Sequence, residues 1–196
     1  MKKKKSSLVG TIVFLILLAA VIIGIYLKIT NGKDKGAKEI PAETSEADTL
    51  IKKDLYFEYP ATPREVLKLY CRITKCLYND DLTDEQIRKL VIQVRDLYDA
   101  ELLANNDEDE QISFIKSEVA EYRKDKKTIY AYTIDSATNT NYIDTKAGKT
   151  AIIKMYFTLK AGGNMDRAYE EFSLVEDSNG RWKIAGWKAA DKQSWE

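Results

Sequence analysis

The sequence predicts an α+β fold, in which an N-terminal transmembrane helix precedes three helices that pack on an antiparallel sheet. Three observations predict it. Residues 8–27 carry no charge, apolar residues recur at helical spacing between residues 62 and 124, and a period of two takes over between residues 128 and 188. The chain therefore divides into five parts: a basic tail (1–7), a transmembrane helix (8–27), a flexible linker (28–49), one folded domain (50–188) and a C-terminal tail (189–196).

The run Leu8–Leu27 is long enough to cross a membrane, because a helix of 20 residues spans roughly 30 Å. Lys2–Lys5 precede it, and such clusters stay cytoplasmic, so we expect the domain outside the cell membrane. A cleaved secretory signal is the alternative, but its apolar core usually has about 7–15 residues. A lipoprotein is not expected, because no cysteine lies near the end of the run. The sequence favours a retained single-pass anchor.

Charge and composition exclude several function classes. The chain has 31 basic and 31 acidic side chains, and four of the basic ones are Lys2–Lys5, so the rest is net acidic. Nucleic acid is therefore not an expected partner, since phosphate binding needs clustered positive charge. With no histidine in the chain, the commonest general base and metal ligand is missing. We expect no metal, no cofactor and no catalytic residues.

Three helices are expected between residues 62 and 124. Thr62–Glu65 and Thr83–Gln86 are capping boxes, and the second is expected to open one helix that runs to Asn105. The acidic run Asp107–Glu110 matches no calcium loop and is interpreted as the start of the third helix. Cys71 and Cys76 would lie on the first helix, about 140° apart around its axis, too far for a disulfide.

Strands are expected at residues 128–135, 150–160, 165–176 and 181–188, with a short extended piece at Tyr142–Ile143. If Gly162–Gly163 and Asn179–Gly180 are two-residue turns, Phe172 faces both Ile153 and Trp187. The resulting core face, which the helices should cover, consists of Ile153, Met155, Phe157, Leu159, Ala168, Phe172, Leu174, Ala185 and Trp187.

The opposite face of the sheet is too apolar at one end to be a plain solvent surface. It carries Tyr156, Tyr169, Trp182 and Ile184. We expect it to meet residues 50–59, a second copy of the chain, or another envelope protein.

One charged residue falls on the core face. The register places Glu170 opposite Met155, where a carboxylate must find a partner, reach solvent or take up a proton. A rim residue in water and an acid in a pocket are both consistent with this position. If the domain binds a ligand, Glu170 is the candidate residue, with Tyr98 or Tyr122 as the donor opposite. Tyr70 and Trp187 are the other aromatic side chains available to such an interior.

Helices followed by an antiparallel meander that closes on Gly180–Trp187 (GRWKIAGW) resemble the curved, cone-shaped fold named after nuclear transport factor 2. Residues 62–187 are also similar to a family of single-span extracytoplasmic proteins of unknown function from clostridia and related Gram-positive bacteria. That similarity is carried by Arg95–Leu103 (RDLYDAELL), Tyr59–Pro63 and the closing strand.

The resemblance leaves three functions open. The first is a membrane-anchored, non-catalytic interaction or scaffold module of the cell envelope, which is the function we expect. The second is a cone domain that binds a small ligand. The third is an enzyme similar to ketosteroid isomerases, for which Asp135, Tyr130 and Tyr132 supply residue types without a recognisable pattern.

Overall fold

The structure, a computed structural model, describes residues 44–146 and 148–195, without the side chains of residues 193 and 194. The predicted anchor Leu8–Leu27, the basic tail and most of the predicted linker lie outside these residues. Within the described part of the chain, no helix combines the length and apolar character needed to cross a membrane. The described residues form one compact unit.

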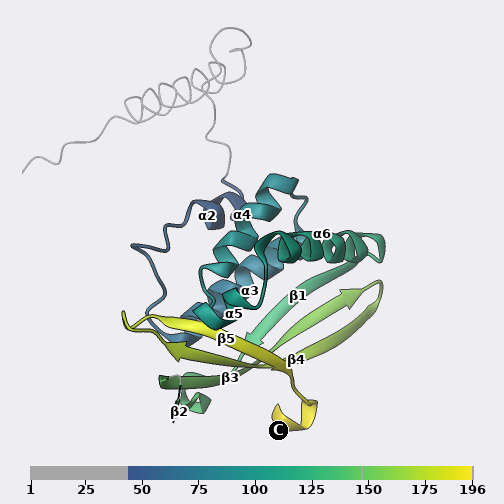
Figure 1. The fold of residues 1–196 in the computed structure, drawn as a ribbon. Coiled ribbons are helices and arrows are strands. Elements are labelled where there is room, and N and C mark those ends of the chain that lie inside the picture. The colour runs from purple at the N-terminus through teal and green to yellow at the C-terminus, as the bar shows by residue number, and fades with distance from the viewer. Residues whose placement is uncertain (1–43, 147, 196) are drawn as a thin grey trace, which may run out of the picture. The chain divides into compact units, whose positions relative to one another are not determined.

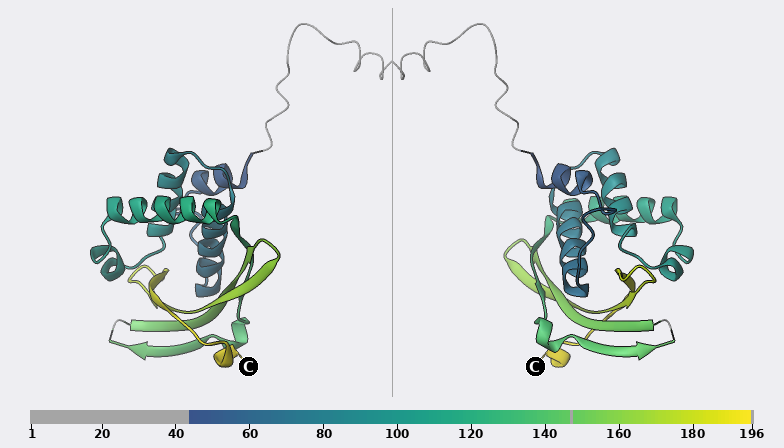
Figure 2. Two further views of the ribbon diagram at one scale, coloured as in Figure 1. Left: turned by 90° about the vertical axis from the view of Figure 1, so that its right-hand side faces the viewer. Right: turned by 90° about the vertical axis from the view of Figure 1, so that its left-hand side faces the viewer.

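The described unit is an α+β domain with all its α-helices on one face of an antiparallel sheet (Figures 1 and 2). Its α-helices are α2 (Glu46–Lys52), α3 (Pro63–Asn79), α4 (Asp84–Arg95), α5 (Ala100–Ala104) and α6 (Glu108–Lys124). Its strands are β1 (Lys127–Ile134), β2 (Asn141–Thr145), β3 (Gly148–Ala161), β4 (Asn164–Glu176) and β5 (Trp182–Ala189). Short 3-10 helices occupy Ala137–Asn139 and Lys192–Trp195.

The sheet has the strand order β1-β3-β4-β5, and β2 pairs with the first part of β3. Figure 2 shows that the sheet curves strongly and that α3 lies against its concave face. At the margins of the sheet, α5 contacts β5 and α6 contacts β1. The predicted α+β class, with helices packed on an antiparallel sheet, is confirmed.

The folded unit begins earlier than the sequence indicates. The predicted linker extends to residue 49, but α2 begins at Glu46, and Ser45 caps it by accepting a hydrogen bond from the Asp48 backbone N–H (3.1 Å). Ala47 and Leu50 are buried. The polar composition of this segment does not predict the helix. Two buried side chains are enough to hold so short a helix against α4, and they leave no apolar stripe in the sequence.

The second predicted helix is divided in two. Its start at the Thr83 capping box is confirmed, but α4 ends at Arg95 and α5 begins at Ala100. Between them the chain pairs with β5: the Ile184 N–H donates to the Leu97 carbonyl (2.8 Å), and the Asp99 N–H donates to the Ile184 carbonyl (2.9 Å). Tertiary pairing therefore overrides a helical pattern that continues through this segment.

The predicted pairing of β3 with β4 is confirmed. Ile153 faces Phe172, Tyr156 faces Tyr169, Met155 faces Glu170, and Ala161 faces Asn164 across the Gly162–Gly163 turn.

The predicted pairing of β4 with β5 is wrong near the turn. The Asp177 N–H donates to the Arg181 carbonyl (2.8 Å), so the loop has three residues, with Gly180 at φ 74°. This slip by one residue exchanges the two faces of the strand, and Leu174 faces Ile184 instead of Ala185. An irregularity between Ser173 and Leu174 then restores the predicted pair of Phe172 and Trp187.

The predicted outer apolar face changes accordingly. Trp182 and Ile184 were expected on it but are buried, because the slip turns them toward the core. Tyr156 and Tyr169 do lie on the outer face, where the C-terminal tail covers them. The Trp195 ring lies 4.9 Å from that of Tyr156 and 6.0 Å from that of Tyr169, measured between centroids. The four residues predicted as one partner surface are therefore not one exposed surface.

The core lies between α3 and the concave face of the sheet. Cys71 and Cys76 both lie on α3 as buried free thiols. The Cys71 sulfur lies 3.5 Å from the Met155 sulfur, and the Cys76 thiol donates to Asp80 (3.0 Å). Burial raises the pKa of both thiols, which keeps them protonated and behaving as small apolar side chains.

Candidate functional site

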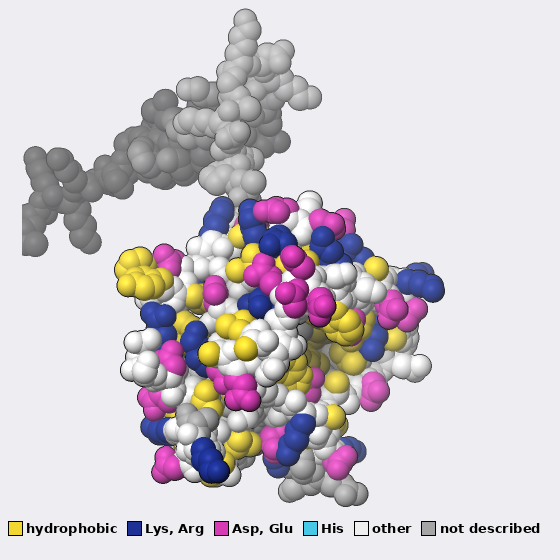
Figure 3. Space-filling view, viewed as in Figure 1, with side chains coloured by type: hydrophobic (Ala, Val, Ile, Leu, Met, Phe, Trp, Pro, Cys, Tyr) yellow, Lys and Arg dark blue, Asp and Glu magenta, His cyan; other side chains and the backbone are white. Residues whose placement is uncertain are grey.

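Four aromatic rings line one end of the interior. The Trp187 ring of β5 stacks on that of Phe172 (5.5 Å between centroids) and lies 6.0 Å from those of Tyr70 and Tyr98. Trp187 nevertheless keeps 42% of its surface exposed. Figure 3 shows that this side of the domain is hollowed between the helical layer and the sheet, with hydrophobic side chains on the wall of the hollow. The rings from α3, β4, β5 and the α4–α5 segment therefore form an aromatic wall that solvent reaches at Trp187, while Tyr70, Tyr98 and Phe172 are buried behind it.

Glu170 lies on the same face of the sheet as this aromatic wall. It is opposite Met155 on β3 and Ala189 on β5, and two residues before Phe172 on β4. Its Oε2 atom is buried and has no hydrogen-bond partner among the described residues. Desolvation raises the pKa of the Glu170 carboxyl from 4.5 to about 7. Glu170 as a whole is partly buried, and one of its carboxyl oxygens is enclosed at the edge of the interior.

The neighbours of Glu170 are uncharged. Burial is the main cause that raises the pKa of Tyr70 and of Cys71, and the Glu170 charge raises the pKa of both further. Cys71 in turn lies against Met155, which is paired with Glu170. A phenol, a thiol and a thioether thus surround the carboxyl, and none of them can neutralise it as a counter-ion.

Tyr98, the predicted donor opposite Glu170, lies beside the aromatic wall, and its described contacts are with Trp187 and Gln111 rather than with Glu170. Its ring faces Trp187, and its hydroxyl accepts a hydrogen bond from the Gln111 side chain (3.3 Å). Burial raises the pKa of Tyr98 to about 12, so it stays a neutral phenol at physiological pH.

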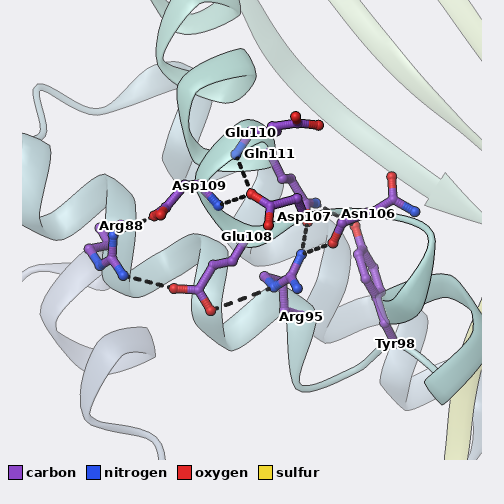
Figure 4. A network of polar contacts seen from close by, with 9 residues as sticks. All are labelled: Arg88, Arg95, Tyr98, Asn106, Asp107, Glu108, Asp109, Glu110 and Gln111. Carbon is purple, nitrogen blue, oxygen red and sulfur yellow. Dashed lines mark hydrogen bonds and ion pairs between the residues drawn. The ribbon is translucent and has the colours of Figure 1, made fainter.

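A polar network holds Tyr98 at the edge of the aromatic wall (Figure 4). Arg95 donates to the Asn106 carbonyl (2.9 Å) and to the Gln111 side chain (2.7 Å). Glu108 forms an ion pair with Arg88 (2.8 Å) and lies 3.9 Å from Arg95. These contacts join the start of α6 to α4 and fix the segment from which Tyr98 projects.

Tyr122 is not brought to Glu170. Its ring packs on that of Tyr78 (4.6 Å between centroids), and the Lys127 ammonium lies 4.6 Å from its centre. Tyr78 donates to Glu118 of α6 (2.5 Å). Tyr122 therefore belongs to a separate contact between α3, α6 and the start of β1.

Asp135 is also separate from the interior acid. Its side chain accepts hydrogen bonds from the Ser136 N–H (2.7 Å) and the Asn139 amide (2.8 Å). It lines an outer pocket of about 520 Å³ together with Glu171 and Trp195. Tyr130 is 57% exposed. The structure does not assemble these residue types into a site with Glu170.

The site combines the exposed ring of Trp187, a carboxyl with a raised pKa and a buried oxygen without a hydrogen-bond partner among the described residues. Among the residues that the structure describes, no group of three or more Cys, Asp or Glu side chains is arranged to hold a metal ion.

Fold and site together define an α+β domain with helices on the concave face of an antiparallel sheet and an acid in its interior. The chain belongs to the family described as Domain of unknown function (DUF6715), whose sequence model matches residues 1–187. The match includes the predicted anchor as well as the domain. No curated protein matches the chain.

Proposed function

We propose that this chain binds a small ligand in the interior between its helices and its sheet. The observation that carries the proposal is the buried, unpartnered Oε2 atom of Glu170 beside an aromatic wall that solvent reaches. Leaving a buried polar group unpaired costs stability. A carboxyl with a perturbed pKa next to a hollow is a typical feature of binding sites.

The proposal includes the placement of the domain. Leu8–Leu27 would anchor the chain in the cell membrane, with Lys2–Lys5 in the cytoplasm and the domain outside. The curved sheet around α3 supports a cone of the type named after nuclear transport factor 2, and the closing strand of that fold supplies Trp187. The resemblance to single-span proteins of clostridia and related Gram-positive bacteria is part of the same proposal.

Ligand binding replaces the scaffold function that the sequence favours. The scaffold hypothesis is supported by the predicted anchor, by the predicted linker and by an outer sheet face that carries Tyr156, Tyr169, Trp182 and Ile184. Two of these residues are buried, and Trp195 packs over the other two. The interior acid, in contrast, has the environment that a ligand site needs.

Fluorescence of Trp187 tests the ligand site. The full chain in lipid nanodiscs, with Trp182→Phe and Trp195→Phe, keeps Trp187 as its single tryptophan. Titration with a panel of small aromatic molecules, charged and neutral, should change its emission in a saturable way for at least one of them. Ala168→Phe, on the Glu170 face, should abolish the change, whereas Ser173→Phe, on the opposite face, should not. No saturable change with any member of the panel would refute the proposal.

Membrane fractionation tests the anchor. Because the apolar run is long and uncharged, the full chain should stay in the membrane fraction during carbonate extraction. External protease should cut between residues 31 and 43 and release an intact domain, since α2 protects the chain from Glu46 onward. A soluble product whose N-terminus follows directly after Leu27 would indicate a cleaved signal instead.

A further inference from the structure

Resting on the proposed function, we propose that the ligand is an organic ammonium ion, whose positive charge lies beside Glu170 and whose apolar part lies against the exposed ring of Trp187, which the buried rings of Tyr70, Tyr98 and Phe172 support. Near this site, an acidic side chain lies on the inner face of the sheet and the basic side chains lie on its outer face.

The sheet keeps its own cations away from Glu170. Near Glu170, the basic side chains of the neighbouring strands lie on the opposite face: Lys188 forms an ion pair with Glu171 (2.9 Å), and Arg167 lies over the Tyr156 ring (4.9 Å). Lys154 is the cross-strand partner of Glu171 and shares that face. Lys149 shares the Glu170 face but lies beside the other end of β4, where it pairs with Glu176 (3.7 Å). The adjacent acid of β4 thus has its cation, whereas the interior acid has none. A positively charged ligand would supply the missing partner.

The aromatic wall selects for the same sign of charge. The face of each ring carries negative charge density, which attracts cations and repels anions. Trp187, at 42% exposed, offers its ring to a ligand, whereas Tyr70, Tyr98 and Phe172 are buried behind it. An anion would meet both the carboxylate and the ring faces unfavourably, and a neutral ligand would leave the carboxylate uncompensated.

Acidic side chains also lie at the start of α6. Asp107 caps this helix and Glu108, Asp109 and Glu110 form its first turn, which lies near Tyr98 because Gln111 donates to the Tyr98 hydroxyl (Figure 4). Figure 3 shows acidic side chains beside the hollow. Arg88 compensates Glu108 (2.8 Å) and Asp109 (3.2 Å), so only Asp107 and Glu110 add negative charge that no described ion pair offsets. These residues are no site by themselves, but their sign agrees with that of the interior.

Binding should depend on pH through one group. The titratable side chains that face Glu170 are Tyr70 and Cys71 of α3, with Tyr98 beyond them; Met155 and Ala189 flank it on β3 and β5. Burial raises the pKa of the two tyrosines and the cysteine, so only Glu170 changes charge between pH 5 and pH 8. An ammonium ion requires the carboxylate, and its affinity should rise through about pH 7.

Probes that differ only in charge test the inference. Phenyltrimethylammonium and tert-butylbenzene have the same shape, as do benzylammonium and ethylbenzene. The full chain in nanodiscs is titrated with each probe while Trp187 emission is followed, and empty nanodiscs provide the blank for partition into lipid. At pH 8 at least one cation should bind about tenfold more tightly than its neutral isostere, and the preference should fall toward pH 5. The quaternary probe keeps its charge throughout, so its pH dependence reports the protein.

Two variants test the preference for an ammonium ion separately from the existence of the ligand site. Glu170→Gln should remove the preference for the cation and retain binding of the neutral isostere, whereas Glu171→Gln should change neither. If the neutral probes bind as tightly as the cations in the unaltered chain, the ammonium inference is overturned and the ligand site stands. If no small aromatic molecule of either charge binds, both are overturned.

Discussion

Replacing Ile184 with lysine is expected to unfold the domain, whereas the same change at the next residue, Ala185, leaves it folded. Ile184 is fully buried opposite Leu174. A lysine there loses the packing of the isoleucine and buries an ammonium without a partner, a combination that costs more than about 4 kcal/mol. Ala185 is half-exposed at the irregularity of β5, so a lysine there should cost less than about 1 kcal/mol.

Urea denaturation of both variants, followed by circular dichroism, measures this difference. The comparison also tests the turn, because a two-residue turn at Asn179–Gly180 would exchange the two positions between the faces of the sheet. If Ala185→Lys unfolds the domain and Ile184→Lys does not, the three-residue loop is wrong.

Stability is expected to fall as the pH rises from about 5 to about 8. In the folded domain the Glu170 carboxyl has a pKa of about 7, against 4.5 for the same group in an unfolded chain. Between these values the folded state holds a proton that the unfolded state has released, so the contribution of the neutral acid is complete below pH 4.5 and is lost as the pH rises through 7. A shift of this size corresponds to about 3 kcal/mol as an upper value.

Glu170→Gln should remove this dependence, because the amide imitates the neutral acid and has no charge to bury. The variant should therefore be about as stable at pH 8 as at pH 5, and more stable than the unaltered chain at pH 8. Glu171→Gln serves as the control, since Glu171 lies on the outer face beside Lys188. Denaturation curves at half-unit steps of pH provide the measurement, and an unchanged slope in Glu170→Gln would show that another group is responsible.

The sequence predicts what depends on local pattern. The caps at Thr62, Thr83 and Asp107 correctly mark where α3, α4 and α6 begin, because each cap acts within one turn of its own helix. The Gly162–Gly163 turn correctly sets the register of β3 and β4. From that register alone, Glu170 falls on the core face, and so the acid of the candidate site is found without the structure.

Features that depend on distant contacts are missed. An Asn-Gly pair fits a two-residue turn as well as a three-residue loop with Gly180 at positive φ, and only packing decides between them. The helical stripe through Leu97 and Tyr98 shows nothing of the pairing with β5 that divides the helix. Tyr122 falls on the buried stripe of α6 as predicted, but the periodicity of a helix does not reveal which neighbour that stripe meets. Trp195 follows the last predicted strand, so no helical or strand periodicity predicts where its side chain packs.

The pairing of the α4–α5 segment with Ile184 also determines how the edge of the sheet can associate. β5 is an edge strand, and edge strands present free backbone groups to which another chain can add. At Ile184 both outward groups are already occupied, by the Leu97 carbonyl and the Asp99 N–H. A strand from a second molecule could add here only by displacing this segment, which would withdraw Tyr98 from the interior. Growth of the sheet along this edge and an intact aromatic wall are therefore mutually exclusive.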